Sequence, residues 1–252
     1  MTNTTVANRS TSASERSRVY SLLATALAYP TDTGIEAISD AIAGAAPAFP
    51  EETQPLLREL AATIPDDLAT LQRSHQRLFP QIESQETPGY ETAYRGDEIF
   101  NHTAIMADIA GFYRAFGLEV GGSTRERPDH VTVELEYLAF VSYKEAISAD
   151  NGESEQADIC ADAERAFLVD HLGDWGPELG RRLGRHSDHD FFSVVGKLLD
   201  WWINRRLDDL GAEPDGNAGT LLSSVIGGDG GDGEPFACEP SAWQPVHFKG
   251  EQ

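Results

Sequence analysis

The segment 126–138 contains residue types whose spacing could support chemistry. Pro128 is placed to open a helix, and Asp129 and His130 then fall in its first turn. Glu134 follows His130 by four residues, which places both side chains on one helix face. Carboxylates beside an imidazole can bind a guanidinium group or contribute to a metal site. A helix buried in a core needs none of these groups, so we predict a bound partner here.

A metal centre is one alternative for this region. Glu98 and His102 repeat the four-residue spacing of His130 and Glu134, so two helices could each present a carboxylate and an imidazole. Di-iron bundles use a Glu-x-x-His spacing instead, with single glutamates on two further helices. The chain shows no serine elbow, phosphate-binding loop or dinucleotide fingerprint. A metal-dependent helical-bundle enzyme using these residues is therefore kept as the alternative function.

Other polar or sulfur-bearing segments have simpler explanations. Cys160 and Cys238 are too few for a disulfide framework or a four-thiolate metal site. The segment 186–190, His-Ser-Asp-His-Asp, could bind a divalent ion but has the composition of a solvated loop between helices. The segment 227–232 matches one copy of a calcium-binding repeat that requires stacked copies. We therefore expect no bound metal or cofactor.

The charge of the chain is strongly unbalanced. It has 42 acidic and 19 basic residues among 252, a formal net charge of −23, and its lysines stand at 144, 197 and 249. Such a surface repels nucleic acid and anionic lipids. Many carboxylates with few lysines favour a salt-rich cytoplasm, where the Debye length falls to roughly 3 Å at 1 M salt, and predict a halophilic archaeon as the source. The N-terminus lacks the apolar core of a signal peptide, and no stretch reaches the roughly 20 apolar residues of a membrane span. We therefore expect a cytoplasmic protein.

Helical periodicity runs through the chain, and no segment alternates convincingly like a strand. The sequence predicts an all-α fold, a single bundle-like domain of two lobes at about 15–118 and 128–210, joined by a hinge at 119–127. Residues 1–14 are expected to be disordered, and residues 211–252, rich in Gly, Asp and Pro, to form a flexible tail. The expected helices cover about 15–29, 33–45, 52–63, 66–79, 101–116, 128–149, 154–171, 175–186 and 189–210.

Several motifs in the middle of the chain resemble a known protein family. The expected helix 101–116 is aromatic and is followed by Gly117, which can end it in the left-handed conformation. The motifs are His75-Gln76-Arg77-Leu78-Phe79, the loop from Pro88 to Tyr94, the segment from Asp108 to Leu118, Glu126-Arg127-Pro128-Asp129-His130, and Glu134-Leu135-Glu136-Tyr137. Together they resemble the TorD/DmsD (NarJ-like) family of molybdoenzyme maturation chaperones. The resemblance runs from about residue 15 to 210 and is specific around 75–140.

The resemblance implies an all-helical cytoplasmic chaperone that is not an enzyme. Members of the family bind the twin-arginine signal peptide, and sometimes the body, of a molybdenum-cofactor oxidoreductase such as a DMSO, TMAO or nitrate reductase. They hold this catalytic subunit until its cofactor is inserted and then release it for export. Some members have been linked to guanine nucleotides or to molybdopterin, for which this chain shows no phosphate-binding loop. A helical scaffold of a respiratory complex is a further alternative, and either a monomer or a domain-swapped dimer is expected.

A twin-arginine peptide offers two guanidinium groups followed by an apolar run. Bidentate arginine–carboxylate pairs are short and charge-assisted, so we expect Glu126, Asp129 and Glu134 to bind the guanidinium groups. His130 would orient them or switch the polarity of the site, and the apolar run would lie in a groove of apolar and aromatic side chains. The expected peptide-binding residues are Leu78, Phe79, Tyr90, Tyr94, Glu126, Pro128, Asp129, His130 and Glu134.

Overall fold

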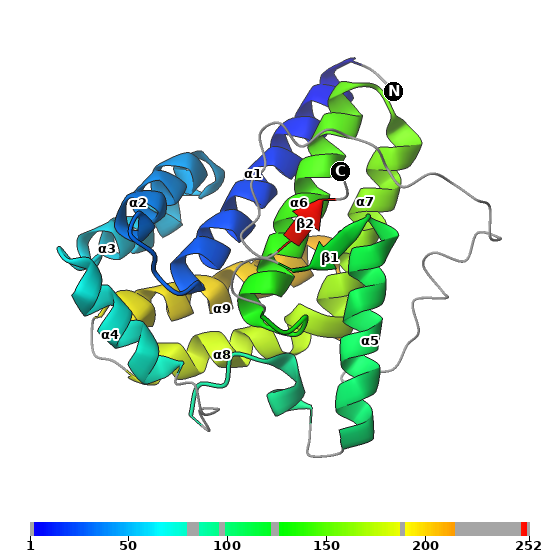
Figure 1. Cartoon of the computed structure of the whole chain (residues 1–252). Helices are drawn as coiled ribbons and strands as arrows, with labels where there is room; N and C mark the ends of the chain where they lie inside the picture. The colour runs from blue at the N-terminus through cyan, green and yellow to red at the C-terminus, as the bar shows by residue number, and fades with distance from the viewer. Residues whose placement is uncertain are drawn as a thin grey trace.

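The computed structural model describes residues 3–79, 86–95, 99–121, 126–186, 190–214 and 248–250. Helices predominate in this part of the chain, which confirms the all-α expectation (Figure 1). The long helices are α1 (Asn3–Leu27), α2 (Gly34–Ala45), α3 (Gln54–Ala62), α4 (Leu68–Leu78), α5 (Ile99–Ala115), α6 (Val131–Asp150), α7 (Ser154–Phe167), α8 (Gly173–His186) and α9 (Phe191–Leu210). The short elements are the helical turns η1 (Ala46–Ala48), η2 (Glu51–Thr53), η3 (Glu91–Tyr94) and η4 (Leu168–Leu172), and the strands β1 (Leu118–Val120) and β2 (Phe248–Gly250).

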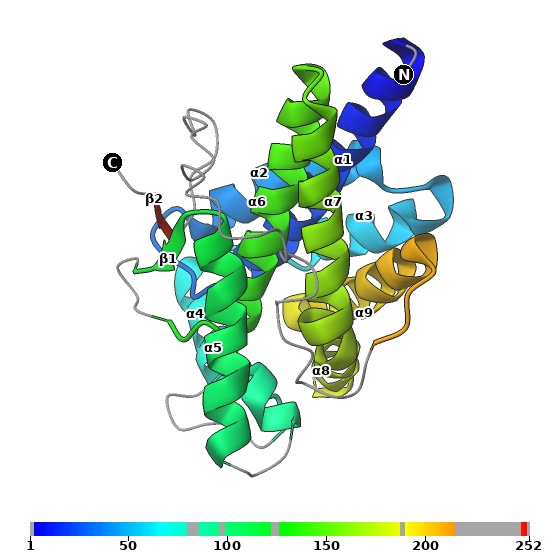
Figure 2. The ribbon, with the colours of Figure 1, turned by 90° about the vertical axis from the view of Figure 1, so that its right-hand side faces the viewer.

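The helix α6 forms the centre of the molecule. It packs between α1 and α7, while α8 and α9 cross the lower end of these helices (Figure 1). The helix α5 stands along another side of α6 and α7 (Figure 2). Val133, Tyr137 and Val141 are fully buried, and most of the other residues of α6 are buried as well. A helix buried on all of its faces must lie inside the bundle, and α6 therefore fixes whatever its N-terminal end carries.

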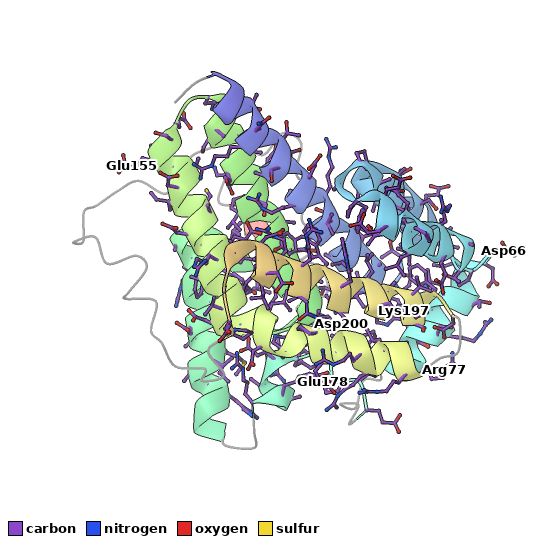
Figure 3. All side chains as sticks on the ribbon, turned by 180° about the vertical axis from the view of Figure 1, so that it is seen from behind. Asp66, Arg77, Glu155, Glu178, Lys197 and Asp200 are labelled. Atoms are coloured by element: carbon purple, nitrogen blue, oxygen red, sulfur yellow. The ribbon has the colours of Figure 1, made fainter. Side chains whose placement is uncertain are left out.

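The helices α8 and α9 approach so closely that their backbones touch. They run side by side on the face shown in Figure 3, with Glu178 on α8 and Lys197 and Asp200 on α9. A Cβ atom added to Gly180 would lie 2.6 Å from the carbonyl oxygen of Gly196, and one added to Gly196 would lie 2.5 Å from that of Gly180. No side chain larger than hydrogen fits at these positions, so the two glycines set the distance between the helices.

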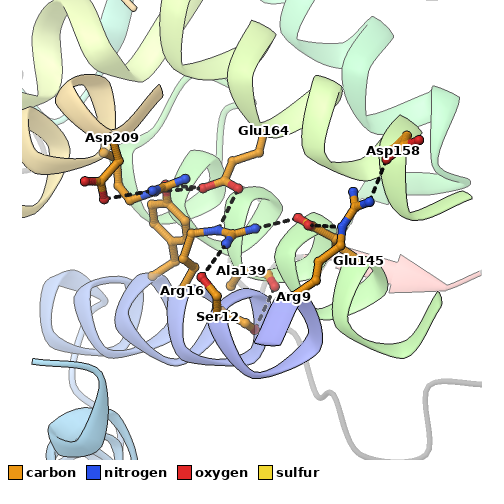
Figure 4. Close-up of polar contacts among 11 residues, drawn as sticks. Arg9, Ser12, Arg16, Ala139, Glu145, Asp158, Glu164 and Asp209 are labelled. Atoms are coloured by element: carbon orange, nitrogen blue, oxygen red, sulfur yellow. Dashed lines mark hydrogen bonds and ion pairs between the residues drawn. The ribbon is translucent and has the colours of Figure 1, made fainter. Parts of the chain in front are cut away.

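The N-terminal segment expected to be disordered is helical from Asn3 onwards, and the prediction for residues 1–14 is wrong for the described part of that segment. Arg9 Nε donates to Glu145 Oε1 at 2.9 Å, and Arg9 Nη1 donates to Asp158 at 2.6 Å (Figure 4). Ala13 is fully buried. These contacts bind the first turns of α1 to α6 and α7, and long-range ion pairs of this kind leave no signal in the local sequence.

The two lobes expected from the sequence share one hydrophobic core. The helix α1, from the first expected lobe, packs along α6, from the second, and α3 packs against α9. Buried residues from Val19 to Leu207 belong to one cluster. The described residues therefore form one packed body, and the division into lobes is not visible in it. Whether the segment 119–127 acts as a hinge stays a prediction, and its residues 122–125 lie outside the described part.

The end of the chain returns to the body. Strand β2 pairs antiparallel with β1, with Glu119 opposite Lys249, so these tail residues are not free of the domain (Figure 1). Residues 215–247, which include Cys238 and the segment 227–232, lie outside the described residues, as do residues 187–189 of the loop 186–190. Cys160 is buried as a free thiol. None of the described helices has the length and apolar character that crossing a membrane requires.

Candidate binding site

The motif at 126–130 forms a turn in front of α6 rather than its first helical turn. His130 is the N-cap residue, with an extended backbone at φ −81° and ψ 138°, and α6 begins at Val131. Its ring nitrogen Nδ1 accepts a hydrogen bond from the backbone N–H of Thr132 at 3.3 Å. The expectation that Pro128 opens the helix is therefore wrong. The capping histidine, rather than the proline, sets the start of α6.

The cause of this shift is a pairing with the loop at 88–94. The backbone N–H of Val131 donates to Gly89 O at 2.9 Å, and the N–H of Glu91 donates to Asp129 O at 2.9 Å. Tyr90 and His130 form the antiparallel bridge between the two segments. A Cβ atom on Gly89 would lie 3.1 Å from the His130 ring, so a larger residue would crowd the pairing. The two motifs therefore form one structural unit at the N-terminal end of α6.

Asp129 holds this unit together from the inside. Its side chain is fully buried and accepts hydrogen bonds from Thr92, through the backbone N–H at 3.3 Å and the hydroxyl at 2.8 Å. Arg127 adds a bidentate pair, with Nε 2.9 Å from Oδ1 and Nη2 2.7 Å from Oδ2. The carboxylate that we expected to bind a partner is thus already occupied by groups of this chain.

Glu134 is also fully buried, and its position differs from the expectation. Its Oε2 accepts a hydrogen bond from the indole N–H of Trp175 at 3.1 Å. Burial, reinforced by the negative charges of Glu91 and Asp129, raises the pKa of Glu134 well above its usual range. The interior thus favours the neutral form of this carboxyl. It faces Trp175 in the interior, whereas His130 faces Tyr90, so the expected pairing of His130 with Glu134 does not form.

A second buried carboxylate, Glu91, connects η3 to η4. The guanidinium of Arg95 lies 3.0 Å from Glu91 Oε1, and His171 Nδ1 lies 3.1 Å from Glu91 Oε2. His171 Nε2 lies 3.5 Å from the carboxylate of Asp108 on α5. Burial alone lowers the pKa of His171, but the contacts with Asp108 and Glu91 outweigh it and raise the pKa to about 9. His171 is consequently a cation at pH 7 that joins three elements.

The accessible part of the site lies around Tyr90. The Arg127 guanidinium carbon lies 4.4 Å from the centre of the Tyr90 ring, at cation–π distance. The Tyr90 hydroxyl donates to Glu126 Oε2 at 3.4 Å, and His130 Nε2 lies 3.7 Å from the same oxygen. Burial, with the nearby Glu126 charge, raises the pKa of Tyr90 to about 12, so its hydroxyl stays protonated. Glu126 is 28% exposed and is the carboxylate of the motif that a partner can reach.

Tyr94 repeats part of this arrangement one turn further along the chain. The guanidinium carbon of Arg182 on α8 lies 5.1 Å from the Tyr94 ring centre. The Tyr94 hydroxyl donates to Pro88 O at 2.9 Å, and its ring packs against Trp175 at 5.2 Å. Arg182 Nε in turn donates to Glu178 at 2.9 Å. Glu178 and Arg182, from a distant helix, thus complete a second surface of tyrosine, arginine and carboxylate.

The remaining expected groove residues lie deeper. Leu78 is buried in the core, and its carbonyl oxygen accepts from the Thr87 hydroxyl at 2.6 Å, so it supports the loop rather than lining a groove. Phe79 is partly buried and packs against the ring of His75 at 4.9 Å. Phe79 also approaches Gly89, where an added Cβ would lie 3.4 Å from Phe79 Cδ1. Of this pair, Phe79 is the one beside the site.

Several residues that build the site were not expected from the sequence. Glu91, with Arg95 four residues later, lies inside the loop that drew attention only for its tyrosines. His171 and Trp175 lie 80 and 41 residues from their partners Glu91 and Glu134, a separation that no local pattern bridges. The missed residues are Glu91, Thr92, Arg95, Asp108, Arg127, His171, Trp175, Glu178 and Arg182.

The metal alternative gains no support from the geometry. Among the described residues, no group of three or more histidine, cysteine, aspartate or glutamate side chains could hold a metal ion. Glu98 lies outside the described residues. His130 and Glu134, the other proposed pair, turn to different partners.

Comparison with known proteins decides the family. Residues 46–180, more than half of the chain, match the family described as nitrate reductase delta subunit. The chain belongs to this family. The matched range includes the turn at 126–130, the loop at 88–94 and their partners His171 and Trp175. The candidate site therefore lies within the part of the chain that matches the family.

Several curated proteins that resemble this chain are named as chaperones. It is 26% identical over 208 residues to the perchlorate reductase assembly chaperone of Dechloromonas aromatica, covering 77% of this chain and 89% of that protein. It is 35% identical over 124 residues to the selenate reductase assembly chaperone of Thauera selenatis, covering 49% of this chain and 61% of that one. It is 25% identical over 122 residues to the chaperone TorD of Vibrio cholerae, covering 48% and 53%. No solved structure matches the chain significantly.

Proposed function

We propose that this protein is a cytoplasmic system-specific chaperone for the catalytic subunit of a molybdenum-cofactor oxidoreductase. It binds the twin-arginine signal peptide, and in some encounters the body, of that subunit before cofactor insertion and export. The family match and the three relatives named as assembly chaperones or TorD support this proposal. The client class is carried over from those relatives, whose own named clients are perchlorate and selenate reductases.

One observation carries the peptide-binding part of the proposal. The partly exposed Glu126 carboxylate stands beside the Tyr90 ring on a turn that buried hydrogen bonds hold rigid. A carboxylate next to an aromatic face suits a guanidinium group, which forms charge-assisted hydrogen bonds in its plane and stacks through its flat side. Glu134 supports the surface from the interior, and the buried Asp129 carboxylate fixes the turn through Thr92 and Arg127.

The arrangement gives no reason to assign a reaction. Glu134 and His171 have perturbed pKa values, but both are closed in the interior by Trp175, Glu91 and Asp108. Groups that cannot meet a substrate serve structure, so we place this protein among binding proteins and not among enzymes. The two alternative functions, a metal-dependent enzyme and a scaffold of a respiratory complex, would each be indicated by a distinct experimental result.

Calorimetric titration of the full-length protein with the signal peptide of a molybdoenzyme encoded nearby, in molar salt, tests the proposal. Micromolar binding is expected, with weaker binding of a peptide in which both arginines are replaced by lysine. Glu126→Gln should weaken binding by up to about fivefold, the value of one exposed ion pair. Glu155→Gln, an equal charge change on the distant surface of α7, should leave affinity unchanged (Figure 3).

Other outcomes separate the alternatives. Binding of the intact oxidoreductase without binding of its peptide would keep the chaperone and reject the peptide contact. Recovery of the protein within the mature, cofactor-loaded complex would instead indicate the scaffold. Stoichiometric metal in the purified protein would favour the enzyme.

A further inference from the structure

Two tyrosines of the site each carry an arginine side chain of this same chain. The guanidinium carbon of Arg127 lies 4.4 Å from the Tyr90 ring centre, and that of Arg182 lies 5.1 Å from the Tyr94 ring centre. Both distances are within the range of a cation–π interaction. Two of the 19 basic residues of this chain, from two different segments, thus lie over tyrosines four residues apart.

Each arginine is also bound to a carboxylate at its edge. Arg127 forms the bidentate pair with Asp129, at 2.9 and 2.7 Å, and Arg182 donates to Glu178 at 2.9 Å. Each guanidinium thus lies over an aromatic ring while its N–H groups reach a carboxylate. Arginine suits this combination better than lysine, because its guanidinium has several N–H donors and can also interact with an aromatic face.

The two surfaces have a fixed spacing. Tyr90 directly precedes the 3₁₀ turn η3 and Tyr94 is its last residue, so a rise of about 2 Å per residue places their backbones about 8 Å apart along its axis. The bridge to His130 fixes Tyr90, and the hydrogen bond from the Tyr94 hydroxyl to Pro88 O fixes Tyr94. Neighbouring arginines of an extended peptide, with side chains on opposite sides of the backbone, can span such a distance with their long arms.

We propose that the Tyr90 and Tyr94 surfaces are the two subsites for the paired arginines of the client, and that Arg127 and Arg182 occupy them in the free protein. The inference rests on the proposed function, because it takes the twin-arginine peptide as the ligand. Binding is then an exchange of one guanidinium for another at each subsite. A buried carboxylate without a cationic partner is costly. The exchange avoids this cost, because the client guanidinium replaces that of Arg127 beside Asp129.

The exposure of the two arginines is compatible with this exchange. The side chain of Arg127 is 41% exposed and that of Arg182 is 33% exposed, and each lies over a tyrosine ring. Both side chains therefore already contact water, and Arg127 leaves its tyrosine by releasing its hydrogen bonds to Asp129 and Thr92. Glu178 also pairs with Arg181 and Arg185, so it keeps cationic neighbours when Arg182 leaves.

The inference predicts that removing the internal arginines strengthens client binding. Arg182→Ala and Arg127→Ala, in the full-length protein, should each bind the twin-arginine peptide about fivefold to tenfold more tightly than the original chain. A tenfold change equals about 1.4 kcal/mol. Arg205→Ala is the matched control, because Arg205 is 45% exposed and pairs with Asp209 on α9, outside the two subsites. It makes the chain equally more negative and should change affinity less than twofold.

Peptide variants locate the effect. A single arginine-to-lysine change in the peptide should cancel most of the gain of Arg127→Ala or of Arg182→Ala, according to which subsite that arginine enters. Because Arg127→Ala removes a partner of a buried carboxylate and can weaken the fold, thermal unfolding is measured alongside, and Arg182→Ala carries the test if Arg127→Ala is unstable.

The outcomes separate this inference from the proposed function. If the original chain binds the peptide and both variants bind it equally or more weakly, the internal occupancy is refuted while the chaperone function stands. If neither the original chain nor Arg182→Ala binds any twin-arginine peptide, the peptide-binding function and the inference fall together. A gain as large for Arg205→Ala would show that overall charge, and not the subsites, sets the affinity.

Discussion

Replacement of Asp129 by alanine should destabilise this protein rather than simply weaken partner binding. The fully buried carboxylate accepts from the backbone N–H and the hydroxyl of Thr92, which is itself 2% exposed. Each buried donor left without an acceptor costs about 1–3 kcal/mol. The Arg127 side chain is 41% exposed and can be hydrated when Asp129 is absent, so loss of this ion pair adds little to the loss in the free energy of unfolding. The expected loss in the free energy of unfolding is about 2–4 kcal/mol.

Equilibrium urea unfolding at fixed salt concentration measures this loss. Asp129→Asn keeps one oxygen acceptor for Thr92 and should cost clearly less than Asp129→Ala. Asp158→Ala is the matched control, because this aspartate is 61% exposed and its pair with Arg9 should contribute less than about 1 kcal/mol.

A double-mutant cycle locates the effect. Thr92→Val removes the hydroxyl, so Asp129→Ala combined with Thr92→Val should cost at least about 0.5 kcal/mol less than the sum of the single changes. A loss below about 1 kcal/mol for Asp129→Ala, or strictly additive changes, would refute the view that this carboxylate ties the loop at 88–94 to the turn before α6.

Three further changes test other parts of the structure. His171 has a folded pKa of about 9, above the unfolded value near 6.5, so its stabilising contribution is complete below about pH 6.5 and is lost as the pH rises through 9. Urea unfolding between pH 6 and 10 should show this loss in the original chain and a flatter profile in His171→Gln. Burial raises the pKa of Glu134 well above its usual range, so ionisation of this carboxyl costs stability as the pH rises; Glu134→Gln should therefore become more stable relative to the original chain with rising pH, and a constant difference across the pH range would refute this. Gly196→Ala places a methyl group 2.5 Å from Gly180 O and should cost about 1–3 kcal/mol by overpacking, whereas Gly44→Ala, with open space around it, should be neutral or stabilising in the same assay.

The order and extent of most helices could be read from the sequence. Amphipathic spacing and capping residues are local, so α2, α4, α7 and α9 appear where periodicity predicts them, and Gly211 ends α9 with φ 54°. Two boundaries failed for a common reason. The helix α1 extends to Asn3 because Arg9 reaches Glu145 and Asp158, and α6 starts only at Val131 because the turn before it pairs with Gly89. Both depend on partners far away in the chain.

The site divides in the same way. The sequence by itself determined that two motifs belong together, since Tyr90 of one and Glu126, Asp129 and His130 of the other meet in front of α6. It also placed the acidic groups whose chemistry suits guanidinium. Residue type and local spacing were sufficient for this, because the motifs lie on elements that form from local interactions.

Only the tertiary structure decided what each charged group does. Glu126 remains partly exposed, while Asp129 and Glu134 are closed in by Thr92 and Trp175. Their roles follow from burial, because removal from water favours the neutral form of a carboxyl and makes every remaining charge require a partner. Those partners come from segments 37 and 41 residues away, and the packing of such segments onto one another, not their spacing in sequence, sets the protonation and accessibility of the site.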